Sequence, residues 1–309
     1  MKKGLILKST GSWYSIKTSD GKIIQCKIKG KLRTLDLKST NPVSVGDWVD
    51  IELIEDSNDV GVIVNIHERK NYIIRKSSNL SKQTQIIAAN VDQALLIITL
   101  INPITSREFI DRFMAAAEAY RIPVILVINK TDLYDESLIL TLQDINETYA
   151  KIGYKVIETS VIENKNLDIF RSLLDNKISV LSGNSGVGKS SLINTIFPNI
   201  NLKVGKISDY HLKGKHTTTF AEMVELPFGG YIIDTPGLKG FGLANIQKEE
   251  VYHFFPEIFR KAQTCQYNNC LHLDEPKCSV KDAVLTGEIS ESRYLSYLSI
   301  VDDVNTKYR

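Results

Sequence analysis

The chain has 309 residues, enough for two or three domains, and its 43% hydrophobic and 24% charged content is ordinary for a globular protein. No apolar run approaches the roughly 20 residues that span a bilayer, and the start of the chain does not resemble a secretion signal, so we expect a cytoplasmic protein with no membrane association. The net charge of +2 conceals an uneven distribution, because residues 1–40 carry ten Lys or Arg against two Asp, while the other 269 residues sum to −6.

The first part of the chain, residues 1–70, is predicted to be a small β-barrel. Residues 4–67 contain five short β-rich runs separated by turn signals, among them the Asp20-Gly21 pair that is typical of a hairpin. A five-stranded oligonucleotide-binding (OB) barrel suits this pattern, and an SH3-like barrel fits it nearly as well.

The basic charge of this barrel points to a polyanionic partner, and we expect RNA. Lys27, Lys29 and Lys31 alternate along the chain, which would place them on one face of a strand as a track for phosphates. A lysine-rich surface that serves only solubility explains the charge equally well.

Residues 69–83 are expected to be a basic, polar connector, after which strands and helices alternate. Buried strands are predicted at 91–101, 123–129 and 154–160, and a helix follows each of them. The first of these helices carries Thr105 and Glu108 at the spacing of a capping box. Such alternation is typical of a parallel sheet with helices on both faces, which we place at residues 71–245, followed by a helical domain at 246–309.

A glycine loop between a predicted strand and a predicted helix carries the G-x-x-x-x-G-K-[ST] signature of a phosphate-binding loop. Its backbone N–H groups should wrap the phosphates, Lys189 should reach the β and γ oxygens, and Ser190 should hold Mg²⁺. The helix that follows, from about residue 189 to 197, points its positive end at the anion. The expected contacts to GTP extend over Gly183, Asn184, Ser185, Gly186, Val187, Gly188, Lys189, Ser190 and Ser191.

The base-reading signature lies upstream of this loop. Asn129, Lys130, Thr131 and Asp132 form an N-K-x-D pattern at the end of a predicted strand. The Asp132 carboxylate can accept two hydrogen bonds from guanine, through N1–H and the exocyclic amine, and adenine offers neither in that geometry. At the end of the next strand, the segment Thr159-Ser160 lies where a backbone N–H could meet guanine O6.

The switch elements follow the phosphate loop. Asp234 and Gly237 form an Asp-x-x-Gly pattern, in which Asp234 would reach Mg²⁺ through water and the Gly237 N–H would sense the γ-phosphate. Thr218 is the threonine expected to supply the second hydroxyl to Mg²⁺. Leu238 stands where many GTPases carry the glutamine that orients water, so we expect slow turnover alone; His216 is a candidate for that role, against the alternative of an ordinary surface histidine.

A cysteine cluster marks the C-terminal domain. Cys265, Cys270, His272 and Cys278 give the spacing C-x₄-C-x-H-x₅-C. Three thiolates and an imidazole make a closed tetrahedral set for one structural Zn²⁺, although this is not a common finger spacing and incidental clustering is the alternative. Cys26 lies in a strand pattern, and we expect it to be a small buried hydrophobe.

These signatures occur in an unusual order, with the base reader before the phosphate loop. A parallel sheet is held by strand packing rather than by connectivity, so a circularly permuted chain can build the same pocket. With IAANVDQ, NKTD, GNSGVGKSS, GKHTTT, DTPGL and the cysteine cluster in this order, the sequence closely resembles the ribosome-small-subunit-dependent GTPase A (RsgA) family over nearly the whole chain.

The resemblance implies a circularly permuted GTPase with an OB-type barrel and a zinc site of this same spacing. It also implies binding of the small ribosomal subunit and its rRNA, assistance to late subunit maturation, and GTP hydrolysis that the subunit stimulates and that is linked to release. GTP and GDP are the expected nucleotides, and a monomer is expected.

Other functions fit parts of the sequence. One is an RNA-binding GTPase switch with a non-ribosomal partner, and another is a signalling switch without RNA. A metabolic or nucleic-acid-dependent ATPase conflicts with the NKTD segment. A zinc and OB nucleic-acid-binding protein with a purely structural nucleotide would show no multiple turnover.

Overall fold

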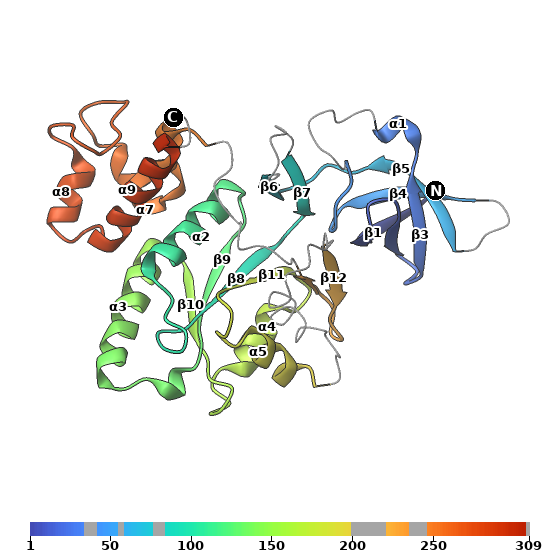
Figure 1. Cartoon of the computed structure of the whole chain (residues 1–309), viewed down its shortest axis with the longest axis horizontal. Helices are drawn as coiled ribbons and strands as arrows, with labels where there is room; N and C mark the ends of the chain where they lie inside the picture. Colours follow the sequence, from blue (N-terminus) through green and yellow to red (C-terminus); the bar gives the residue numbers. More distant parts are fainter. Residues whose placement is uncertain (34–41, 55–58, 77–83, 199–220, 235–245, 307–309) are drawn as a thin grey trace. The chain divides into compact units, whose positions relative to one another are not determined.

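The computed structural model (Figure 1) describes residues 1–33, 42–54, 59–76, 84–198, 221–234 and 246–306. The chain divides into two compact units, each assembled from segments far apart in sequence. The first unit combines Met1–Leu95, Leu167–Ser182 and Lys189–Phe241, and the second combines Leu96–Asn166, Gly183–Gly188 and Gly242–Arg309. In the described part of the chain, no helix is long and apolar enough to cross a membrane.

The first unit begins with a closed five-stranded barrel, which confirms the predicted OB-type barrel (blue in Figure 1). Neighbouring strands follow the order β1-β2-β3-β5-β4, and β4 pairs with β1 to close the ring. Alternate residues point inward because side chains alternate across a strand, and Ile6, Tyr14, Ile16, Ile24 and Ile63 fill the interior. The strands are β1 (Lys2–Ser9), β2 (Tyr14–Thr18), β3 (Ile23–Ile28), β4 (Trp48–Leu53) and β5 (Val60–Ile66).

Two expectations for this region are wrong. Residues 69–83 are not wholly a connector, because β6 (Tyr72–Lys76) pairs antiparallel with β7 (Thr84–Ala89), and the apolar Ile73 is buried in that pairing. The predicted lysine track is also interrupted, because β3 ends at Ile28 and residues 30–33 form a helical turn, α1 (Gly30–Arg33). The alternating spacing of the lysines therefore continues beyond the end of β3, and the three lysines do not share one strand face.

The first unit also contains the strand that leads into the phosphate loop. β11 (Ile178–Ser182) pairs in parallel with β13 (Tyr231–Asp234), and β12 (Glu222–Glu225) pairs antiparallel with β13. β12 in turn pairs with β1 at Lys8 and Glu222, so the barrel and these strands form one sheet within the unit. The helices of this region are α4 (Leu167–Leu173) and α5 (Lys189–Ile196).

The second unit holds β9 (Val124–Ile128) and β10 (Lys155–Glu158), which pair in parallel, and the last residues of β8 (Gln93–Ile98). All residues of β8 and β9 are buried, as expected for strands covered on both faces. α2 (Arg107–Ala119) and α3 (Glu136–Ile152) belong to the same unit. The start of α2 differs from the prediction, because Ser106 rather than Thr105 caps it by accepting a hydrogen bond from Phe109 N–H at 3.2 Å.

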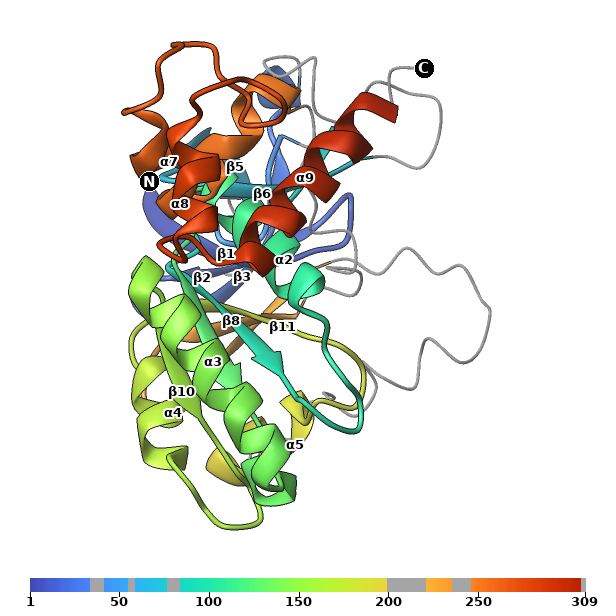
Figure 2. The same cartoon turned by 90° about the vertical axis from the view of Figure 1, so that its left-hand side faces the viewer.

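The C-terminal helices also belong to the second unit, in which α9 and η4 pack on α2, and Figure 2 shows α9 beside α2. They are η4 (Lys248–Phe254), α7 (Pro256–Ala262), α8 (Ser279–Leu285) and α9 (Glu291–Thr306). Phe255, Ile258 and Tyr297 are fully buried in their shared core. Arg293 is 0% exposed as well, and its guanidinium donates to Asp111 on α2 at 2.8 Å and to Glu257 on α7 at 2.7 Å.

Candidate functional site

The phosphate-loop segment Gly183–Gly188 lies in the second unit together with the N-K-x-D segment. Gly183 has φ 139°, and a Cβ there would lie 2.1 Å from Ile97 O. Gly188 has φ 95°, and a Cβ there would lie 2.4 Å from Asn129 Nδ2. Both positions therefore require glycine, for conformation and for space, and the loop passes directly against the ends of β8 and β9.

Asn129 joins the two signatures. Its side-chain amide donates to Val187 O in the loop at 2.9 Å, and its side-chain oxygen accepts from the Thr159 hydroxyl at 3.0 Å. Its backbone N–H donates to Ile98 O at 2.9 Å, and the residue is 2% exposed. The structure thus brings together three of the predicted segments, at 129–132, 159–160 and 183–188, through one buried amide.

Asp132 lies in a short helical turn, η1 (Thr131–Leu133), which is separated from the end of β9 by Asn129 and Lys130. Its Oδ1 accepts a hydrogen bond from the Ser160 hydroxyl at 2.5 Å, a bond that the sequence does not predict. Ser160 is fully buried, whereas Asp132 is half-buried, so the carboxylate is braced from the protein side. A braced carboxylate with an accessible oxygen can accept hydrogen bonds from a ligand.

The backbone N–H groups of Thr159 and Ser160 are already used. Thr159 N–H donates to Ile128 O at 2.8 Å, and Ser160 N–H donates to Lys165 O at 3.3 Å. The next amide along the chain belongs to Val161, which is half-buried. The Val161 N–H is therefore the next backbone donor at this turn. A sequence pattern could not identify it, because the pattern does not show which amides are already bonded.

Some of the remaining predicted residues lie in the described part of the chain, and the others lie outside it. Lys189 and Ser190 form the first turn of α5, immediately after Gly188, and Asp234 is the last residue of β13. Ser191 is exposed on the same turn of α5. Thr218, Gly237, Leu238 and His216 lie outside the described residues.

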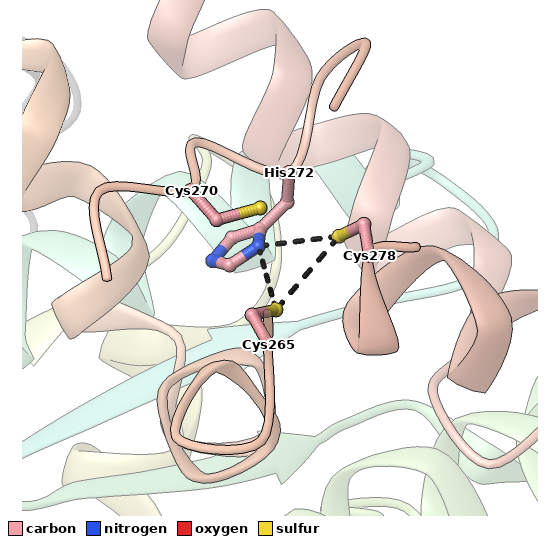
Figure 3. Close-up of side chains that lie close together, drawn as sticks. All are labelled: Cys265, Cys270, His272 and Cys278. Atoms are coloured by element: carbon pink, nitrogen blue, oxygen red, sulfur yellow. Dashed lines mark hydrogen bonds between the residues drawn. The ribbon is translucent and has the colours of Figure 1, made fainter. Parts of the chain in front are cut away.

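The cysteine cluster is assembled as its spacing predicts. Figure 3 shows Cys265, Cys270, His272 and Cys278 converging, and one ligand atom from each lies within 4.8 Å of the others. His272 Nδ1 is 3.4 Å from Cys278 Sγ and 3.7 Å from Cys265 Sγ, and the two sulfurs are 4.0 Å apart. Tetrahedral bonds of about 2.3 Å to sulfur and 2.1 Å to nitrogen require separations of about 3.6–3.8 Å, so the donor set fits one four-coordinate metal ion.

The surroundings hold these ligands in place. The Glu275 carboxylate accepts from the N–H groups of Leu271 and Leu273, each at 2.8 Å, on both sides of His272. The Tyr294 hydroxyl donates to His272 O. Burial raises the pKa of the Cys270 thiol to about 12, so an adjacent cation is needed to keep it as the thiolate that binds a metal.

Cys26 is fully buried in the barrel, and burial raises the pKa of its thiol to about 11, as expected for a thiol that acts as a small hydrophobe.

The chain matches two protein-family models, which together span most of its length. The family model described as RsgA GTPase matches residues 66–244, and the model described as RsgA N-terminal domain matches residues 3–63. The chain belongs to the RsgA GTPase family. It is therefore a GTP hydrolase, and its sheet is that of a circularly permuted GTPase.

Relatives of similar length support this membership. A protein of Phocaeicola vulgatus named small ribosomal subunit biogenesis GTPase RsgA is 53% identical over 308 residues, covering 99% of each chain. A protein of the same name from Flavobacterium psychrophilum is 50% identical, covering 99% of this chain and 94% of its own.

Two solved structures share the fold. YjeQ from Thermotoga maritima matches with a TM-score of 0.81 and 34% identity, over 98% of each chain. YloQ, described as a circularly permuted GTPase, matches with a TM-score of 0.76 and 31% identity, over 99% of this chain and 96% of its own.

Proposed function

We propose that this RsgA-family GTP hydrolase acts in late maturation of the small ribosomal subunit, where it binds the subunit and its rRNA and leaves after hydrolysis. The observation that carries the proposal is the 53% identity, over 99% of both chains, to a protein named for small-subunit biogenesis. The competing function, an RNA-binding switch on a non-ribosomal partner, has no comparable support among the relatives.

For guanine recognition, we propose that Asp132 reads N1–H and the exocyclic amine, with Asn129, Lys130 and Thr131 shaping the pocket. The bond from Ser160 to Asp132 supports this role, because it fixes the carboxylate while leaving it acceptor capacity. Thr159 acts through Asn129. The amide that meets guanine O6 is assigned to Val161, since the amides of Thr159 and Ser160 are already bonded.

For the phosphates, we propose that the 183–191 loop wraps them and that Lys189 binds the β and γ oxygens. Mg²⁺ would be held by Ser190 and, in the triphosphate state, by Thr218, with Asp234 acting through water and Gly237 sensing the γ-phosphate. The positions of Lys189 and Ser190 at the start of α5 support the first part, because a helix N-terminus favours an anion.

For the metal, we propose one structural zinc ion per chain. The Cys₃His donor set, its burial and its separations support zinc over harder ions, which prefer oxygen ligands. Four protein ligands leave no open coordination position, so the ion would stabilise the C-terminal helices rather than take part in hydrolysis.

For RNA, we propose the exposed face of β3 and Trp13, the residue before β2, as the contact surface. Lys27 lies over the Trp13 ring at 4.4 Å, and both side chains are exposed. An exposed aromatic ring beside a cation suits stacking of an unpaired base next to a phosphate. In this account, the domains at 1–70, 71–245 and 246–309 act together as a cytoplasmic monomer.

The proposal is tested by cosedimentation of the purified protein with small ribosomal subunits. We expect binding in the presence of a non-hydrolysable GTP analogue and weaker binding with GDP, while large subunits bind poorly in both states. Equal and weak binding to both subunits in both nucleotide states would favour a non-ribosomal partner.

A further inference from the structure

The loop that follows β8, from Thr99 to Thr105, carries none of the GTPase signatures, yet it is tightly braced. The Thr99 hydroxyl donates to Pro103 O at 2.5 Å, and Thr105 N–H donates to Thr99 O at 2.9 Å. The Thr105 hydroxyl oxygen accepts from Thr99 N–H at 3.3 Å. These bonds close the loop on itself, and Thr99 and Thr105 are both buried.

This loop contacts the segments proposed to bind the base and the phosphates. Lys130 Nζ donates to Asn102 O at 2.6 Å. On the other side, Pro103 Cδ lies 3.4 Å from where a Cβ would stand at Gly186 in the phosphate loop. The loop at 99–105 therefore contacts both the segment proposed to read the base and the segment proposed to bind the phosphates, all within the second unit.

Tyr134 also links the loop at 99–105 to the base-reading segment, through two hydrogen bonds of its hydroxyl. Its hydroxyl oxygen accepts from Leu100 N–H at 3.0 Å, and the hydroxyl donates to Asn129 O at 2.8 Å. Burial raises the pKa of the phenol to about 12, so the donor is retained at neutral pH. Tyr134 also ends the η1 turn, because its N–H donates to Thr131 O at 3.3 Å.

Asp132 stands between these two anchors. Lys130, two residues before it, is bonded to Asn102, and Tyr134, two residues after it, is bonded to Leu100. The η1 turn that carries the Asp132 carboxylate is thus hydrogen-bonded to the loop at 99–105 on both sides of Asp132. A displacement of either anchor would move Asp132 relative to Val187, to which Asn129 is bonded.

We propose that Tyr134 is a positioning residue for guanine selection, which holds Asp132 in register with the phosphate loop through the loop at 99–105. This inference rests on the proposed role of Asp132 as base reader. The hydroxyl is required because it accepts from the Leu100 N–H and donates to the Asn129 carbonyl at the same time, which a phenyl ring cannot do.

The test is Tyr134→Phe, which keeps the ring and removes only the hydroxyl. We expect GDP affinity to fall by about tenfold, the value of one or two hydrogen bonds. IDP lacks the exocyclic amine and makes one bond fewer to Asp132, so its affinity should fall less and the GDP to IDP ratio should shrink. Hydrogen exchange at the Leu100 amide should accelerate, because its acceptor is gone.

Tyr154→Phe is the matched control. The Tyr154 hydroxyl donates to Glu118 at 3.0 Å, in the same unit but among groups with no proposed role in the nucleotide site. Like Tyr134→Phe, the Tyr154→Phe variant removes one hydrogen-bonded hydroxyl. It should leave the ratio of GDP to IDP affinity and the hydrogen exchange of the Leu100 amide unchanged.

Asp132→Asn distinguishes a failure of the positioning role of Tyr134 from a failure of the base-reading role of Asp132. If this variant loses guanine preference while Tyr134→Phe keeps the wild-type GDP to IDP ratio, the positioning role is wrong and the site assignment stands. If Asp132→Asn itself leaves the ratio unchanged, both are wrong.

Discussion

Asp132 and Arg293 are charged residues of the second unit with opposite surroundings. Asp132 is half-buried, with Ser160 as its partner at 2.5 Å. Arg293 is completely buried, with its bonds satisfied by Asp111 and Glu257. Burial alone would lower the pKa of Arg293, but the two carboxylates outweigh burial and raise it, so the residue stays charged. The Asp132 carboxylate keeps acceptor capacity for the proposed contact with guanine, whereas the charge of Arg293 is neutralised within the fold.

Asp132→Asn should weaken GTP binding and shift preference toward xanthine nucleotides. The asparagine amide can donate to the O2 of xanthine, whereas it cannot accept both guanine donors. Competition of GTP and XTP against a fluorescent nucleotide measures this change. Unchanged GTP affinity in the variant would show that Asp132 does not read the base.

Arg293→Ala should lower the free energy of unfolding of the second unit by about 3–5 kcal/mol, because it leaves two buried carboxylates without their cation. Arg112→Ala is the matched control. Arg112 also joins α2 to α9, through Asp303 at 2.7 Å, but its side chain is 35% exposed, so its loss should cost at most about 1 kcal/mol. Urea unfolding followed by helical circular dichroism measures both. Similar costs for the two variants would contradict the role given to burial.

The periodicity of hydrophobic residues predicts most of the helices and strands. The strands at 124–128 and 155–158 and the helix at 136–152 lie where alternating buried runs and amphipathic runs place them. The hairpin of β6 and β7 is not evident from the sequence, because its charged and polar residues obscure the buried Ile73, whose burial depends on a partner strand. The bonds of Ser160 and Tyr134 could not be predicted, because they join residues brought together only by the sheet.

The cysteine cluster should behave as one folding element. Cys270→Ser should lose the metal and loosen α8 and α9, because structural zinc contributes directly to folding. Metal analysis should find about one zinc per wild-type chain. Cys26→Ala, in the barrel, is the control and should keep the metal. A metal-free protein of native stability would remove the zinc assignment.

The exposed face of β3 should bind RNA through the charge of Lys27. Replacing Lys27 with Gln should weaken RNA binding at low salt and reduce the slope of log K against log salt by up to about one, for the one phosphate that is no longer neutralised. Lys8→Gln is the control, because Lys8 is already paired with Glu222 at 3.1 Å. Nucleotide affinity should be the same in all variants. A Lys27→Gln variant that binds RNA like Lys8→Gln would exclude β3 as the RNA face.

At the scale of the whole molecule, the permutation makes one compact unit of the base reader, the phosphate-loop segment and the C-terminal helices. α2 follows the loop at 99–105 and packs against α9, and Arg293 bridges α2 to α7. A partner that binds the C-terminal helices is therefore connected through packed elements to the loop that holds Asp132. Such coupling must act in both directions, so nucleotide state should alter affinity for the partner.

If the small ribosomal subunit completes the proposed site, the protein alone should bind GTP well and hydrolyse it slowly. The most direct measurement is GTP turnover with no addition, with purified small subunits and with large subunits. Supplying a missing catalytic group in trans is worth roughly 10³–10⁵ in other GTPases, so a large acceleration by small subunits alone is predicted. Equal rates under all three conditions would contradict the account.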